Sequence, residues 1–221
     1  AVPRRPGWAR EAWARLSRYT LLKTVGITAF MWLFFIAYFY LLRHPVVPVT
    51  QMPLTAIDRA IPFQPWGLPV YLSLWFYIGI APGLLPTLPR LLAYGAWAAA
   101  LCGAGLACFY LWPTAVPPHV VDVAAHPEFA VLQGVDAAGN ACPSLHVATA
   151  IFTCLRLERL LREIGAPAGV RWLNVAWFVA IAYSTLAIKQ HVALDVAAGA
   201  ILGTLFALPA GWLERPQTVR R

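Results

Sequence analysis

Long uncharged apolar runs, separated by short basic or proline-rich stretches, dominate the hydrophobic pattern of this chain. A transmembrane helix needs about 20 mostly apolar residues. Segments that meet this need predict six membrane-spanning helices, at residues 22–42, 68–88, 91–112, 143–162, 172–190 and 191–212. The last two segments abut, which predicts a short turn or kink near Lys189 and His191 at the membrane surface.

Composition supports a membrane protein. The chain is 60% hydrophobic and 12% charged, with a mean hydropathy of +0.65, whereas a soluble domain carries about 25% charged residues. A soluble globule of this length could not shelter so much apolar surface. We therefore expect an all-α, polytopic membrane protein with one membrane domain over residues 1–221. Residues 1–20 form a basic N-terminal segment, 21–213 a six-transmembrane-helix bundle and 214–221 a tail.

The first apolar run, Thr24 to Leu42, follows basic residues and could be taken for a signal peptide. At 19 residues it exceeds the roughly 7–15 residues of a signal core, and no small-residue cleavage site follows. It is expected to be a retained helix. The proline-rich stretches at 44–69 and 113–143 predict loops, the first with a short interfacial helix around Thr55 to Ala60.

The distribution of basic residues predicts the orientation of the bundle. On one side of the six predicted spans lie 14 of the 17 basic residues, and on the other lie only Arg43, Arg59 and Lys189. Both termini are therefore predicted to be cytoplasmic, and the loops at 43–67 and 113–142 to face outward. The 14 are Arg4, Arg5, Arg10, Arg15, Arg18, Lys23, Arg90, Arg156, Arg159, Arg162, Arg171, Arg215, Arg220 and Arg221.

The net charge of +8 does not indicate a nucleic-acid binder, because the basic residues lie between apolar runs rather than on one face. No glycine-rich phosphate loop, zinc-finger spacing or RNA-binding aromatic motif is present. The four cysteines form no CxxC pair and fall in or beside apolar runs, so buried free thiols are expected, with a disulfide or a metal role as the alternative. They are Cys102, Cys108, Cys142 and Cys154.

Ionisable residues gather at the predicted outward ends of two spans, where they are costly and rare. His191 and Asp195 are four positions apart, so on one helix they share a face. A carboxylate can hold one imidazole nitrogen and leave the other as a nucleophile or base. The same HxxxD spacing is also common as a plain structural pair, and taken alone it does not decide between the two.

A second group, Pro143-Ser144-Leu145-His146, opens the fourth predicted span. Proline suits the first turn of a helix, and the free N–H groups of a helix start favour an anion such as phosphate. Ser144 could donate to a phosphate oxygen, and His146 could act as general acid toward a leaving alcohol.

The conjunction of Pro-Ser-x-His with Ser184-x6-His191-x3-Asp195 resembles the type 2 phosphatidic acid phosphatase superfamily. That superfamily is marked by a Lys/Arg-Pro stretch, Pro-Ser-Gly-His and Ser-Arg-x5-His-x3-Asp. The resemblance covers the span count, the motif order and residues from about 113 to 195. It implies that His191 is the nucleophile that forms a phosphohistidine, that Asp195 orients it, and that His146 protonates the leaving group and activates the acceptor.

The same resemblance implies that Ser144 and Ser184 help to hold the phosphate, without a cofactor or metal. Two histidines and an aspartate could also bind zinc, which stays an alternative. Leu145 stands where the family usually has glycine, and Thr185 where it has arginine. The stretch from Pro113 to His119 lies in the loop of the first motif but carries no lysine or arginine.

Lys189 is the one cation inside either matched motif and is expected to contact the phosphate. Thr185 and, in the other outward loop, Arg59 are further candidates, although a plain surface role is the alternative for Arg59. So few cations favour a lipid diester or diphosphate over a monoester dianion. The Pro-Ser-Leu-His and Lys-Gln-His-x3-Asp motifs also resemble, locally, those of the inositol phosphorylceramide synthase-like transferases.

Three functions follow as hypotheses: hydrolysis of a lipid phosphate, transfer of the phosphoryl head group to a lipid alcohol, and a catalytically inactive lipid-binding relative. Retention of His146, His191 and Asp195 argues against the last. The expected partners are a lipid phosphate and the bilayer, with no nucleic acid. The absence of an organelle signal and the compact loops favour a bacterial inner membrane with an extracytoplasmic active site. The lipid and the oligomeric state do not follow from the sequence.

Overall fold

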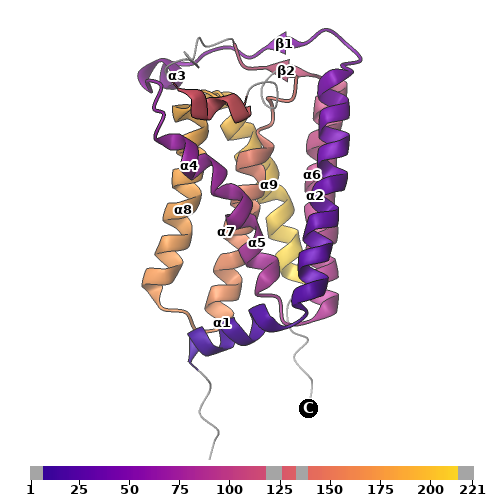
Figure 1. Ribbon diagram of the computed structural model, residues 1–221, viewed down its shortest axis with the longest axis vertical. Coiled ribbons are helices and arrows are strands. Elements are labelled where there is room, and N and C mark those ends of the chain that lie inside the picture. The colour runs from indigo at the N-terminus through magenta and orange to yellow at the C-terminus, as the bar shows by residue number, and fades with distance from the viewer. Residues whose placement is uncertain (1–6, 118–125, 133–138, 214–221) are drawn as a thin grey trace, which may run out of the picture.

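The computed structural model describes residues 7–117, 126–132 and 139–213. These residues form an elongated bundle whose long helices run along its axis (Figure 1). Helix α1 (Trp8–Ser17) lies across one end of the bundle. At the opposite end lie the short helix α3 (Ala56–Ala60) and the strands β1 (Thr50–Gln51) and β2 (Thr114–Ala115). We refer to these two ends as the α1 end and the α3 end.

Among the described residues, four helices are long and apolar enough to cross a membrane: α2 (Thr20–Arg43), α6 (Leu88–Leu111), α8 (Ala168–Ala187) and α9 (Ala193–Leu213). They present large exposed apolar side chains, such as Trp32 and Leu33 of α2 at 69% and 70% exposure. Such a surface suits lipid rather than water. The chain is thus a mostly helical membrane protein, as its hydrophobic pattern predicts. The count of six spans and the orientation of the termini stay predictions.

The predicted span at 68–88 is shorter than expected and interrupted. Helices α4 (Gly67–Leu72) and α5 (Leu74–Gly83) are separated at Ser73. The Ser73 hydroxyl donates to the carbonyl of Val70, at 2.6 Å, and accepts from the indole of Trp177, at 2.9 Å. Back-bonding of a serine to its own helix favours a bend. The predicted end at residue 88 is wrong, since Leu88 already begins α6.

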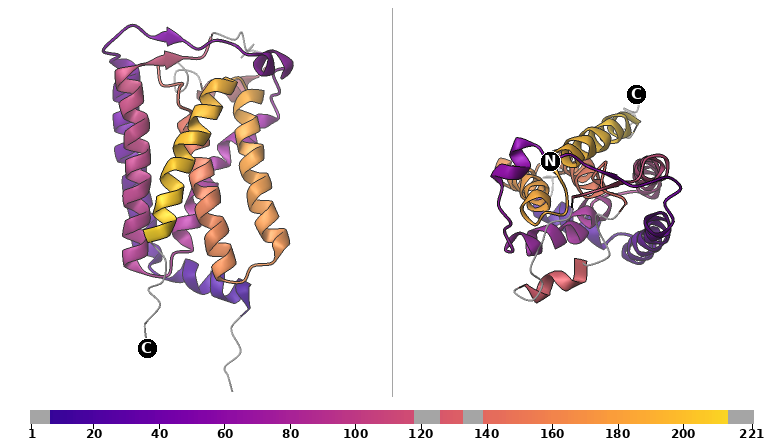
Figure 2. Two further views of the ribbon diagram at one scale, coloured as in Figure 1. Left: turned by 180° about the vertical axis from the view of Figure 1, so that it is seen from behind. Right: turned by 90° about the horizontal axis from the view of Figure 1, so that it is seen from above.

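Helix α7 (Leu145–Glu163) lies in the middle of the bundle and contacts α5, α8 and α9 (Figure 2). Most of its side chains are buried. It is not among the four long apolar helices, because its second half carries charges. Neighbouring helices cover α7, so it does not need the continuous apolar surface of a helix that faces lipid. The charged residues are Arg156, Glu158, Arg159, Arg162 and Glu163.

Small residues let α9 pack directly on the backbone of α7. A Cβ atom at Gly199 would overlap the carbonyl oxygen of Ser144, and one at Gly203 would overlap that of Ala148. Close approach through a small-x3-small spacing is typical of membrane helices. This contact places the start of α9 beside the start of α7, and each start carries one of the two predicted motifs.

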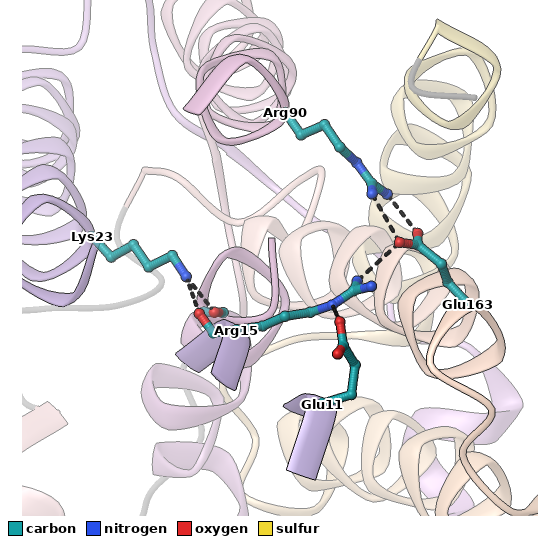
Figure 3. A network of polar contacts seen from close by, with 6 residues as sticks. Glu11, Arg15, Lys23, Arg90 and Glu163 are labelled. Atoms are coloured by element: carbon teal, nitrogen blue, oxygen red, sulfur yellow. Dashed lines mark hydrogen bonds and ion pairs between the residues drawn. The ribbon is translucent and has the colours of Figure 1, made fainter. Parts of the chain in front are cut away.

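A network of charged side chains closes the α1 end (Figure 3). The Glu163 carboxylate of α7 accepts hydrogen bonds from Arg90 of α6 at 2.8 and 3.0 Å and lies 3.0 Å from Arg15 of α1. Arg15 also pairs with Glu11 at 2.8 Å. Lys23 of α2 donates to the backbone carbonyls of Arg15 and Gly83, at 2.7 and 2.6 Å. The network therefore joins α1 to four other parts of the bundle.

The α3 end contains a feature that the all-α prediction lacks. Strands β1 and β2 pair in parallel, with Thr50 opposite Thr114. Thr114 also accepts from the N–H groups of Ala141 and Cys142, at 2.9 and 2.8 Å. These bonds fix the segment that leads into α7. A 3-10 helix, η1 (Pro127–Leu132), lies at the same end. The predicted short helix around Thr55 is confirmed as α3.

Candidate active site

The turn between α8 and α9 carries His191 and confirms the predicted break near Lys189. The carbonyl of Thr185 accepts from the N–H groups of both Gln190 and His191, at 3.0 and 3.1 Å. Lys189 lies in the left-handed region, at φ 61°, which is uncommon for a residue with a side chain. The turn therefore fixes the backbone of His191 against the end of α8.

His191 and Asp195 come together, but not on one helix as predicted, because α9 begins at Ala193 and His191 lies in the turn before it. The His191 Nδ1 atom lies 3.5 Å from the Asp195 Oδ2 atom, and the two side chains are 7% and 0% exposed. Oδ2 also accepts from the N–H of Val192, at 3.1 Å, as a carboxylate in the first turn of a helix commonly does. Within the described residues, His191 Nδ1 and Asp195 Oδ1 make no hydrogen bond. A buried carboxylate thus faces the imidazole.

Ser144 joins the two motifs. It is the N-cap of α7, where its hydroxyl oxygen accepts from the N–H of Val147, at 3.3 Å. Its own N–H donates to the backbone carbonyl of Asp195, at 3.0 Å. Pro143 precedes the N-cap, so the expectation that it lies in the first turn is wrong. The start of α7 is therefore hydrogen-bonded to the start of α9.

His146 lies in the first turn of α7 and is 8% exposed. Its Nε2 atom lies 3.0 Å from the carbonyl oxygen of Tyr71. A carbonyl only accepts, so Nε2 carries the proton in this arrangement. The Tyr71 ring stacks on the imidazole with centroids 3.9 Å apart and an interplanar angle of 12°.

Ser184 and Thr185, two of the predicted phosphate-binding residues, lie at the end of α8, and each hydroxyl has a partner in the protein. The hydroxyl of Ser184 donates to the carbonyl of Ile181, at 2.7 Å, and that of Thr185 to Ala182, at 2.8 Å. Both side chains are buried. Their placement at the end of α8 brings them next to the turn, while their hydroxyl protons point back along their own helix.

The two cations among the predicted phosphate-binding residues differ. The Lys189 ammonium donates to the backbone carbonyls of Asp58, at 3.0 Å, and Ile61. Arg59 is exposed and donates to the carbonyl of Leu54, at 3.2 Å. The Lys189 side chain therefore contacts the backbone of α3 and of Ile61, which follows it, whereas the Arg59 side chain lies on the exposed surface of α3.

Sequence reasoning did not select Asp58 or Tyr71. The Thr-x-x-Asp spacing of Thr55 and Asp58 is a readable sign of a helix start, and the structure has that capping box. The contacts of Asp58 with Lys189 and Ala193, more than 130 positions away, leave no such pattern in the sequence. Tyr71 contacts His146 across 75 positions, and nothing in the local pattern of an apolar helix marks one aromatic residue among many.

The stretch from Pro113 to His119, at the position of the first family motif, is only partly described by the structure. Its described part, Pro113 to Pro117, includes Thr114, which is 1% exposed and holds the segment leading to α7. Pro118 and His119 lie outside the described residues. All four cysteines are free, as expected, but only Cys102 and Cys154 are buried, whereas Cys142 is half-buried and Cys108 exposed. Within the described residues, no three His, Cys, Asp or Glu side chains gather as a metal site would require.

Comparison with known proteins adds a family to this geometry. Neither a curated protein nor a solved structure matches the chain. A family model described as the PAP2 superfamily matches residues 34–208, which is more than half of the chain and includes His146, His191 and Asp195. The predicted resemblance is confirmed, and the chain belongs to the type 2 phosphatidic acid phosphatase superfamily, whose members are phosphatases and phosphotransferases.

Proposed function

We propose that this protein transfers the phosphoryl group of a lipid phosphate or diphosphate through a phosphohistidine at His191. One observation carries the proposal. His191 contacts Asp195 at 3.5 Å. The backbone carbonyl of Asp195 accepts a hydrogen bond from the N–H of Ser144, at 3.0 Å, and this bond joins the pair to the first turn of α7, which bears His146. A nucleophile, an orienting carboxylate and a second imidazole in one place are the parts that covalent phosphoryl transfer needs.

The chemistry proceeds in two steps. Asp195 faces Nδ1 of His191, which leaves the Nε2 lone pair to attack phosphorus. The P–N bond forms as the bond from phosphorus to the leaving oxygen breaks, and His146 gives that oxygen a proton. In the second step His146 takes a proton from the acceptor hydroxyl, the acceptor oxygen bonds to phosphorus, and the P–N bond breaks. Catalytic hydrogen bonds are often long before substrate binds and tighten afterwards, which suits the 3.5 Å contact.

His146 would use one nitrogen for this proton transfer. Its Nε2 atom faces the Tyr71 carbonyl, so Nδ1 is the atom that gains and loses the proton. The carbonyl stabilises the Nε2 proton in both states of the ring. This division of labour between the two nitrogens is typical of catalytic histidines.

The phosphate would lie at the starts of α7 and α9, where helix N–H groups favour an anion. Ser144 can donate from its hydroxyl while its oxygen still caps α7. Ser184, Thr185, Lys189 and Arg59 are the further candidates, and each would have to turn from its present partner. Because cations are few, a diester or diphosphate suits the site better than a dianionic monoester.

Hydrolysis is the first candidate reaction, and no metal or cofactor has a part in the proposed steps. Transfer to a lipid alcohol is the second, favoured by the local resemblance of Pro143-Ser144-Leu145-His146 to the inositol phosphorylceramide synthase-like branch. The low exposure of His146 and His191 (8% and 7%) also restricts water and so supports a lipid acceptor. An inactive lipid-binding relative would not need the pairing of His191 with Asp195.

The orientation is also proposed. The basic residues Arg10, Arg15, Arg18 and Lys23 belong to the α1 end or the start of α2, and this supports a cytoplasmic α1 end. The site would then face outward, in our proposal from a bacterial inner membrane. A cysteine introduced at Gln51 should react with an impermeant thiol reagent on intact cells, in a background without Cys108 and Cys142, and one at Arg162 should not. The reverse pattern would contradict this orientation.

The function can be tested with purified protein and a panel of lipid monoesters, diesters and diphosphates. Release of free phosphate would identify a hydrolase, and new head-group lipids in the presence of a lipid alcohol would identify a transferase. A radiolabelled substrate should leave an acid-labile phosphoenzyme when the reaction is stopped early. A protein that binds these lipids but turns over none of them would contradict the proposal.

A further inference from the structure

Two contacts with one short segment bracket His191. Two residues before it, the Lys189 ammonium donates to the carbonyls of Asp58 and Ile61. Two residues after it, the N–H of Ala193 donates to the Asp58 Oδ1 atom, at 2.8 Å. Both sides of the histidine are therefore hydrogen-bonded to the same helix, α3, which lies about 130 positions away in the sequence.

Asp58 is itself held in place. Its Oδ2 atom accepts from the N–H and the hydroxyl of Thr55, both at 2.7 Å, and the residue is 8% exposed. Burial alone would raise the pKa of the Asp58 carboxyl. The hydrogen bonds from Thr55 and Ala193, together with the nearby charge of Lys189, outweigh burial, and the pKa lies below its usual 3.8. Asp58 is thus a charged acceptor at neutral pH.

The turn needs such support. Lys189 has φ 61°, a conformation that costs free energy for a residue with a side chain and persists where its surroundings enforce it. A third bond, from Gln64 N–H to the carbonyl of Ala187 at 2.9 Å, ties the chain after α3 to the end of α8. The segment from Thr55 to Gln64 therefore contacts α8, the turn and α9 in succession.

We propose that this segment is a clamp that holds His191 in its attacking position, with Asp58 and Lys189 as positioning residues on its two sides. The proposal rests on the proposed phosphoryl transfer at His191. For Lys189 it is an alternative to direct phosphate contact, because two of its three N–H donors already bind carbonyls. A nucleophile displaced by about 1 Å can lose about a hundredfold in rate, so loss of the clamp should lower kcat.

The test compares Asp58→Ala, Lys189→Met and the double variant with the wild type, as full-length protein in lipid nanodiscs. Each single change should lower kcat by about 10- to 100-fold and leave KM within about threefold, because substrate contacts are retained. The double variant should be little worse than either single one, since both remove the same clamp. Burst kinetics of phosphoenzyme formation should show that this first step is the one slowed.

Two matched variants separate the clamp from general damage. Ile57→Ala removes an exposed side chain of the same helix, at 55% exposure, and should leave kcat unchanged. Lys189→Gly accepts the positive φ without cost and removes the whole side chain, so it should match Lys189→Met if the ammonium carries the effect. Hydrogen exchange at residues 188–196 should accelerate in Asp58→Ala and Lys189→Gly, while α7 keeps its protection.

Lys189→Met with an unchanged kcat and a raised KM would assign Lys189 to direct phosphate contact and overturn the clamp. Multiplicative losses in the double variant would do the same. Exchange at residues 188–196 that stays at the wild-type rate would also overturn it, whatever the activity. If the wild type turns over no lipid phosphate, the proposed function fails, but the exchange measurement still decides whether the segment holds the turn.

Discussion

The two ends of the bundle use polar residues in different ways. At the α1 end, Glu163 binds Arg15 and Arg90 through both of its oxygens, and Lys23 adds bonds to backbone carbonyls. At the α3 end, charges meet neutral backbone groups, as Asp58 does with Ala193 and Lys189 with Ile61. The first pattern fastens helices together through exposed or half-buried side chains. The second shapes the backbone around the histidines.

In the part of the chain that the structure describes, both ends contain buried polar atoms without a hydrogen-bond partner, but in different surroundings. Buried polar atoms in native proteins nearly always have a partner, and an exception calls for a reason. Within the described residues, Nδ1 of His191 and Oδ1 of Asp195 are buried and make no hydrogen bond. At the α1 end, Nη1 of Arg15 and Nε of Arg90 are buried and, among the same residues, make no hydrogen bond either. Those two side chains are already held in ion pairs with Glu163, whereas His191 and Asp195 belong to the pair that we propose to bind substrate and transfer protons.

The largest expected effect comes from His191→Ala. If His191 is the nucleophile, turnover should fall by at least about a thousandfold, since removal of a covalent nucleophile costs this much or more. The acid-labile phosphoenzyme should disappear as well. Both are measured with a lipid substrate that the wild type cleaves. Turnover that survives the change would remove the nucleophile assignment and with it the contrast between the two ends.

His146→Ala should have the next largest effect. Loss of a general acid or base slows a reaction by about 10²- to 10⁴-fold. A substrate with a good leaving group needs little protonation, so its first step should be less affected and phosphoenzyme should accumulate. Rapid-quench measurements with two leaving groups check this. Equal slowing with both leaving groups, without accumulation, would indicate that His146 acts on neither proton transfer.

A glycine substitution tests how the helices hold the site. Gly199→Ala should overlap the carbonyl of Ser144 and destabilise the protein by about 1–3 kcal/mol, as overpacking does. It should also lower kcat, because it separates the starts of α7 and α9. Gly95→Ala is the matched control, since a Cβ there meets nothing within 4 Å. Thermal unfolding and kcat are measured for both. Equal results for the two variants would contradict the role of this contact.

Much of the helical plan could be predicted from the sequence, because lipid-facing helices leave a long apolar signal. The signal weakens where a helix is covered by protein. The span predicted at 143–162 corresponds to α7, whose charged second half gives it a weaker apolar character than α2. It fails at Ser73, where the interruption depends on a contact with Trp177, 104 positions away.

The candidate site was partly predictable for a similar reason. The spacing of His191 and Asp195 is local, so the two side chains meet even though His191 lies in the turn just before α9 and not on the helix itself. Sequence reasoning selected Lys189 as the one cation near them, but it could not foresee the direction of its side chain. That direction depends on α3, whose carbonyls it meets across 128 and 131 positions. Such long-range contacts leave no periodic trace in the sequence.

The smallest expected effect lies at the α1 end, in Glu163→Gln. The side chains of Arg15, Arg90 and Glu163 are 11%, 22% and 32% exposed, and ion pairs of this kind contribute about 0.2–1 kcal/mol. The change should therefore lower the thermal midpoint by about 1–4 °C and leave kcat and KM as they are. The shift should shrink in high salt, which screens half-exposed charges. Arg90→Gln in the Glu163→Gln background should add little, because the two residues form one network. A loss of activity without a loss of stability would show that the α1 end communicates with the histidines, and the division of labour between the two ends would then be wrong.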